Sequence, residues 1–245
     1  MRVALRIEAP SLEAALVAEV LGDLGEVDLL DPWDVRSVTE AYDLAVCVGP
    51  VTSCPIARRR VLLVLGPTAW HPKCAEWDDV VVTSPAAERN ALGHFGHGVR
   101  VRLNPPPLLA MRAGRRRLLK RNVRGLCASP GGEQEGAPAS VIEMALWSLP
   151  EGCQVPFSAM EFNSLCLNGA YGVYRRMGDG YDIQVRRHLA LGSPVLAPRN
   201  EDVLGDLAEL CLEDFDGHSI PVEPVEDKVS VEGYVEALRE TIRRK

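Results

Sequence analysis

RVLLVL, residues 60–65, places five apolar residues in a row after a single arginine. An uninterrupted apolar run of this length is typical of a strand buried on both faces, as in a parallel sheet covered by helices on each side. DVVVT, residues 79–83, repeats the pattern a short distance along the chain. These two runs favour an α/β fold.

The residues around this pair alternate short apolar runs with helical patterns. We expect further strands at residues 3–7, 26–30, 43–48 and 99–103. We expect helices at residues 11–21 and at residues 85–92, the second closed by Gly93. Asn104 and the three prolines after it then stop the alternation, because consecutive prolines continue neither a helix nor a central strand.

A second α/β series follows this break. We expect strands at 123–128, 153–157, 171–174 and 194–197, and helices at 137–149, 200–207 and 231–244. The pattern predicts an α/β protein with two Rossmann-like, doubly wound lobes facing a central cleft. The expected domains are an N-terminal lobe at 1–107, a basic hinge segment at 108–124 and a C-terminal lobe at 125–245, whose last helix crosses back to the first lobe.

Composition points to a cytoplasmic protein. The chain has 245 residues, 47% of them hydrophobic, and a net charge of −7. No stretch is long and apolar enough to cross a membrane, and Arg6 and Glu8 interrupt the first apolar run, which argues against a signal peptide. Seven cysteines without a Cys-x-x-Cys pair favour a reduced compartment. Residues 112–124 depart from the acidic average, with seven basic side chains and no acid.

DGYDIQVRRHLALGSPVLAP, residues 179–198, contains an acidic glycine turn, a helical pattern, a break at Gly192 and a short apolar strand. This order, with Leu-Ala-x-Gly-x-Pro-Val, resembles the donor-binding region of GT-B nucleotide-sugar glycosyltransferases. Residues 78–84 and 99–107 resemble the late strands of the N-terminal lobe of that class. The resemblance covers most of residues 75–210 in order and spacing, with few identical positions.

The resemblance implies a glycosyltransferase that uses a nucleotide-sugar, UDP-sugar above all, as co-substrate. Free N–H groups at the start of the helix near Tyr181 would face the diphosphate, and a glycine turn would let it approach closely. The expected donor-binding residues are Gly131, Gly132, Glu133, Asp179, Gly180, Tyr181, Arg186 and Arg187. For the two arginines, the alternative is the solvated face of an ordinary helix.

One position departs from the class. Arg187 stands where the family commonly has a glutamate that accepts hydrogen bonds from the donor, and an arginine accepts none. Asp179 or Asp182 would supply the acceptor instead. His71, expected at the carboxyl end of a strand, is the candidate base toward an acceptor hydroxyl. His71 and Asp182 are therefore the candidate catalytic residues, although a lone histidine in such a loop is also a common structural residue.

The acceptor is not specified by the sequence. Arg115, Arg116 and Lys120 are candidates for contact with an anionic acceptor or a phosphate, which makes nucleic acid, including a modified base in DNA, one expectation. The alternative for this basic segment is a solvated helix or linker. We expect no bound metal and no tightly bound cofactor. Two other functions remain open: a non-catalytic nucleotide or sugar-phosphate binding protein, and an epimerase of the same fold.

Overall fold

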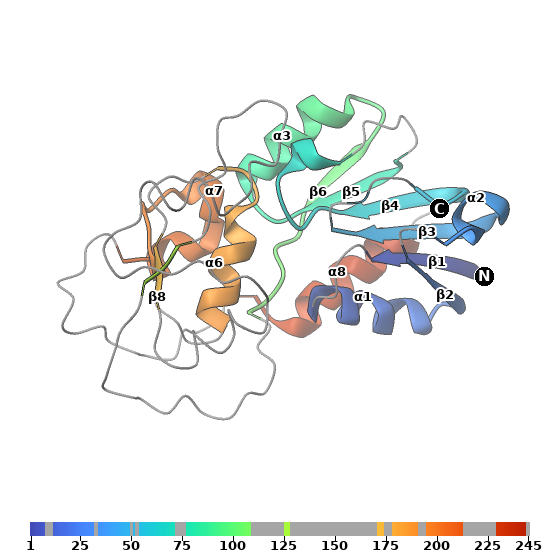
Figure 1. Cartoon of the computed structure of the whole chain (residues 1–245), viewed down its shortest axis with the longest axis horizontal. Coiled ribbons are helices and arrows are strands. Elements are labelled where there is room, and N and C mark those ends of the chain that lie inside the picture. The colour runs from blue at the N-terminus through green and yellow to red at the C-terminus, as the bar shows by residue number, and fades with distance from the viewer. Residues whose placement is uncertain are drawn as a thin grey trace. The chain divides into compact units, whose positions relative to one another are not determined.

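The computed structural model divides the chain into two compact units, Met1–Pro107 with Val229–Lys245, and Leu108–Lys228 (Figure 1). Each unit is considered by itself. The structure describes residues 1–7, 12–31, 34–49, 51, 54–71, 77–108, 125–127, 171–173, 178–190, 195–212 and 229–243. No helix among these residues is long and apolar enough to cross a membrane.

The first unit contains a six-stranded, wholly parallel sheet, which confirms the predicted α/β class. Its strands are β1 (Arg2–Ile7), β2 (Glu26–Leu30), β3 (Tyr42–Val48), β4 (Ala57–Leu63), β5 (Asp79–Val82) and β6 (Arg100–Leu103). Their order across the sheet is β2-β1-β3-β4-β5-β6. The direction of winding reverses between β1 and β3, which is the mark of a doubly wound sheet.

Helices cover both faces of this sheet (Figure 1). The helices of the unit are α1 (Leu12–Gly22), α2 (Arg36–Thr39), α3 (Pro85–Phe95) and α8 (Val231–Arg243), with a 3₁₀ turn at Thr68–Trp70. On one face, α1 and α8 bury Val46, Val61 and Leu63 of the central strands. On the other face, α3 packs Ala87 and Ala91 over β5 and β6. The apolar run after Arg60 is buried because both faces are covered.

The end of α3 differs from the expectation from sequence. Ser84 caps the start of the helix by accepting a hydrogen bond from the Ala87 N–H, and Pro85 occupies the first turn. The helix continues through Gly93 and ends at Gly96, so the expected closure at Gly93 is wrong. Gly96 has φ of 82°, and its N–H bonds the Leu92 carbonyl oxygen. The left-handed conformation, which favours glycine, decides which glycine ends the helix.

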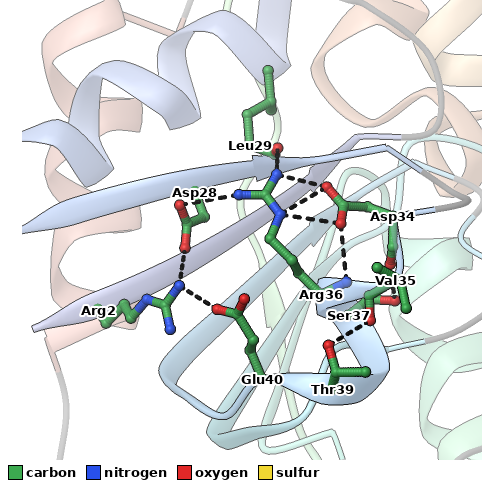
Figure 2. Close-up of polar contacts among 9 residues, drawn as sticks. All are labelled: Arg2, Asp28, Leu29, Asp34, Val35, Arg36, Ser37, Thr39 and Glu40. Atoms are coloured by element: carbon green, nitrogen blue, oxygen red, sulfur yellow. Dashed lines mark hydrogen bonds and ion pairs between the residues drawn. The ribbon is translucent and has the colours of Figure 1, made fainter.

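An ion-pair network fixes the β2 edge of the sheet (Figure 2). Arg2 of β1 bonds Asp28 of β2 at 2.8 Å and also pairs with Glu40. Arg36 of α2 bonds Asp34 at 2.6 Å and reaches Asp28 at 3.4 Å. Asp28 therefore links two arginines from different elements, and the network holds the short helix α2, which the sequence did not predict, against the edge strand.

The described part of the second unit contains a three-stranded parallel sheet in the order β7-β8-β9. Its elements are β7 (Gly125–Cys127), β8 (Tyr171–Val173), α6 (Tyr181–Ala190), β9 (Val195–Leu196) and α7 (Glu201–Leu204), followed by a 3₁₀ helix at Gly205–Leu210. A helix begins after Asn200, as expected for residues 200–207, but it ends at Leu204, because Gly205 takes φ of 58°, and a 3₁₀ helix follows. The expected elements at 137–149 and 153–157 lie outside the described residues.

Candidate functional site

The candidate donor site begins at the turn before α6. Gly180 has φ of 87°, a conformation that favours glycine over other residues. The turn lets the chain enter α6 at Tyr181 directly after Asp179. Asp182 lies in the first turn of the helix, where a carboxylate interacts favourably with the helix dipole. Two carboxylates thus flank a turn that only a small residue fits without strain.

Most of α6 is buried within the second unit. Ile183, Val185 and Leu189 are core residues, and the polar side chains of Asp182, Arg186 and His188 are buried with them. Gln184 and Arg187 are the exposed residues among those of α6 whose side chains are described. Of the two arginines that the sequence singles out, Arg187 is therefore the one that a ligand in solvent can reach.

Arg186 is held by an ion pair. Its Nη2 bonds Oδ1 of Asp206, in the 3₁₀ helix after α7, at 2.6 Å. Asp206 is a residue that sequence reasoning missed, since nothing in the pattern joins two positions twenty residues apart. Burial lowers the pKa of His188, two residues further along α6, to about 3. At neutral pH, α6 therefore carries a paired guanidinium and an uncharged imidazole in its buried part.

His71 belongs to the first unit and follows the 3₁₀ turn after β4. Its side chain is 3% exposed, and neither ring nitrogen has a hydrogen-bond partner among the described residues. His94 of α3 donates a hydrogen bond from Nε2 to the His71 carbonyl oxygen at 2.8 Å. Burial, with a smaller effect of nearby His94, lowers the pKa of His71 to about 4. The imidazole is thus neutral at pH 7, and its acceptor nitrogen has no hydrogen-bond partner in the part of the chain that the structure describes.

The expected site residues divide among the parts of the chain. His71 lies in the first unit, whereas Asp179, Gly180, Tyr181, Asp182, Arg186 and Arg187 lie in the second. Arg115, Arg116, Lys120, Gly131, Gly132 and Glu133 fall outside the described residues. No group of three or more His, Cys, Asp or Glu side chains that could hold a metal ion occurs in the described part of the chain.

Arg6 is a further charged residue that sequence reasoning did not assign to a site. It is fully buried near the carboxyl end of β1, paired in register with Leu30 of β2 and Cys47 of β3. This end of β1 adjoins the point where the strand order reverses, the usual place for ligands in such sheets. The sequence does contain a sign of this residue, because Arg6 is an arginine within the first apolar run.

No family model matches the chain, and no curated protein matches its sequence.

Proposed function

We propose that the protein is a glycosyltransferase that moves a sugar from a nucleotide-diphosphate donor to an acceptor hydroxyl, and that its two units correspond to the lobes of a GT-B enzyme. One observation carries the proposal: the left-handed turn at Gly180 leads into α6, and α6 is followed by strand β9 of a parallel sheet. This is the order of elements that residues 179–198 share with the donor-binding region of that class.

The chemistry of donor binding follows from the residues at this turn. The leaving diphosphate gains negative charge as the glycosidic bond breaks, and N–H groups at a helix start together with a cation stabilise it. Arg187, exposed on α6, supplies the cation. Asp179, which is only partly buried, accepts hydrogen bonds from donor hydroxyls, whereas Asp182 is fully buried at the start of α6. No step in this scheme needs a metal ion.

Two further residues have separate roles in the proposal. Arg186 is a positioning residue, because its bond to Asp206 ties α6 to the following 3₁₀ helix. His71 accepts the proton of the acceptor hydroxyl. With a pKa of about 4 it is a weak base, so substrate must make the site more polar or bring a carboxylate-bearing residue near it for efficient transfer.

The test is a thermal-shift panel with UDP, GDP, TDP and their common sugar conjugates, with and without magnesium. A ligand that binds only the native state raises the melting temperature as its concentration increases. At 100 times Kd it adds about 2.7 kcal/mol to the free energy of unfolding. We expect one nucleotide to do so in the native protein and in Gln184→Ala, an exposed control on the same helix, and to lose most of its effect in Arg187→Ala. An equal shift in all three proteins, or no shift with any nucleotide, contradicts the proposal.

A second function is favoured by one observation, the arginine at position 187 where the resembling class commonly has a glutamate. A nucleotide or sugar-phosphate binding protein without catalysis would retain the thermal shift and release no nucleotide from the donor. Mass analysis of donor incubated with protein separates the cases, because a transferase yields a glycosylated acceptor, an epimerase yields an isomeric donor and a binding protein leaves the donor unchanged.

A further inference from the structure

Four charged side chains gather on the α8 face of the first unit's sheet. Asp79 of β5 pairs in register with Val61 of β4 and with Arg100 of β6. Because side chains alternate between faces along a strand, Arg59 and Arg102, each two positions from a paired residue, lie on the same face as Asp79. We call Arg59, Arg100 and Arg102 the arginine cluster.

All three arginines of the cluster bond the same carboxylate. Oδ2 of Asp79 accepts from Nη2 of Arg59 at 2.6 Å and from Nη2 of Arg100 at 3.0 Å, and Oδ1 accepts from Nε of Arg102 at 3.2 Å. Burial alone would raise the pKa of Asp79, but the hydrogen bonds from Arg59 and Arg102 outweigh it, and the pKa lies below its usual value. One ionised carboxylate against three guanidiniums leaves two positive charges in excess.

The structural role of Arg59 is clear. Besides Asp79, it donates to the carbonyl oxygens of Ile242, at 2.6 Å, and of Thr241. These are among the last carbonyls of α8, which a cation at the helix end stabilises. Arg59 and Asp79 together therefore account for how β4, β5 and α8 are joined.

Arg100 and Arg102 are not needed for that joint. Among the described residues, each of their guanidinium groups contacts only Asp79, through a single nitrogen. A guanidinium has five N–H donors, so most of those on Arg100 and Arg102 are left for a ligand. The side chain of Arg100 is 51% exposed, and β6 is the edge strand of the sheet. Two guanidiniums, each anchored on Asp79 and with spare donors, thus lie on an edge strand of the described sheet.

We propose that Arg100 and Arg102 bind phosphate groups of a nucleic-acid backbone. The planar fork of a guanidinium matches the oxygens of a phosphate, and anchoring on Asp79 reduces the entropy lost on binding. Arg100 is 51% exposed and Arg102 is 24% exposed, and contacts of this kind favour a polyanion over free phosphate, because several weak contacts add along one backbone.

The acids of the network in Figure 2 lie at the other edge of the described sheet, where Arg2 and Arg36 partly offset them. Asp28, Asp34 and Glu40 belong to the region of β2, and β2 and β6 are the two outermost strands. Five strand spacings separate them, roughly 24 Å. Screening reduces interactions beyond about 10 Å at 0.1 M salt, so these three acids act only weakly on a nucleic-acid backbone at β6.

The experiment measures binding of the full-length protein to a fluorescein-labelled 20-base-pair DNA by anisotropy, at several salt concentrations and without any nucleotide-sugar. We expect Arg100→Gln/Arg102→Gln to weaken binding at least tenfold in low salt. We expect the slope of log K against log salt to become shallower by about 1.8, since each phosphate contact contributes about 0.9. The single variant Arg100→Gln, at a half-exposed position, should lose about half of that slope.

The control is Arg58→Gln/Arg89→Gln, which removes the same charge at two exposed positions, one on the strand face opposite the cluster and one on α3. An equal loss in this control, or unchanged affinity and slope in Arg100→Gln when its melting temperature is native, overturns the proposal. The proposal is also overturned if the protein does not bind DNA and inorganic phosphate raises its melting temperature, but not that of Arg100→Gln/Arg102→Gln. The inference does not depend on nucleotide binding by α6, so either proposal can fail alone.

Discussion

At the scale of single residues, Asp79 and His71 show how burial acts differently on two ionisable groups. Asp79 is buried among guanidiniums that donate to both of its oxygens, so it remains charged. His71 is buried without a hydrogen-bond partner for its ring among the described residues, so the neutral form is favoured and its pKa falls to about 4. The ionised carboxylate of Asp79 is stabilised by the arginines, whereas protonation of buried His71 would destabilise the fold.

His71 therefore predicts a loss of stability in mild acid. The unfolded chain takes up a proton at this residue below about pH 6.5, whereas the folded chain does so only near pH 4. Stability is thus complete above pH 6.5 and declines as the pH falls towards 4, by about 2 kcal/mol between pH 7.5 and pH 5 for this one group. His71→Leu should remove that part of the pH dependence of urea unfolding.

Exposed His97 provides the matched control, and His97→Gln should keep the wild-type pH dependence. Some dependence will persist in His71→Leu, because His188 is also buried and has a pKa lowered to about 3. A His71→Leu protein whose unfolding free energy changes with pH as much as that of the wild type would show that the imidazole is accessible to protons in the folded state.

Sequence reasoning reaches such residues only in part. The position of His71 after a strand can be read from the apolar run at 60–65, but its burial depends on contact with His94, 23 residues later. Arg186 and Arg187 are adjacent, and the local pattern does not separate them. Asp206, distant in sequence, makes one a buried ion-pair partner while the other stays exposed. Which of the two arginines is buried therefore depends on a contact between residues far apart in the sequence.

At the scale of elements, the local hydrophobic pattern predicts where most of the described strands and helices lie. It does not predict the residues at which they begin and end. Hydrophobicity predicts a strand at 60–65, whereas β4 runs over Ala57–Leu63, because Ala57, Arg59 and Arg60 also pair in register with β3. A charged residue belongs to a strand when its side chain finds a partner, as Arg59 does at Asp79. The apolar pattern of a sequence indicates which residues are buried, but it does not indicate ion pairs between strands such as Arg59 with Asp79.

Helix α8 offers a test of how much one element stabilises the first unit. Leu238 is fully buried in the core shared by α1, α8 and the central strands. Leu238→Ala should lower the free energy of unfolding by about 3 kcal/mol, the usual cost of a buried cavity of this size. Glu240→Ala, at an exposed position on the same helix, should change it by less than about 0.5 kcal/mol. A loss below 1 kcal/mol in Leu238→Ala would mean that α8 is peripheral to folding.

At the scale of the whole molecule, the first unit is made from two separate parts of the chain, and the second from the residues between them. The amphipathic pattern at 231–244 predicts a helix, but it does not predict which sheet the helix covers. That depends on packing between distant parts of the chain. The contact of α8 with α1 and the bond from Asn104 Nδ2 to the Tyr234 carbonyl oxygen, at 3.4 Å, show how the late segment joins the early one. The chain thus leaves and re-enters the first unit at neighbouring points.

This proximity predicts that the first unit folds without the second. Replacing residues 108–228 by a flexible Gly/Ser linker of about ten residues, which spans roughly 18 Å, should join Pro107 to Val229 without strain. The shortened chain should unfold in one cooperative urea transition and retain salt-dependent DNA binding that Arg100→Gln/Arg102→Gln weakens, while UDP and the other nucleotides no longer raise its melting temperature. A shortened chain that unfolds without cooperativity would show that α8 needs the second unit to dock, and one that still responds to a nucleotide would move the donor site out of α6.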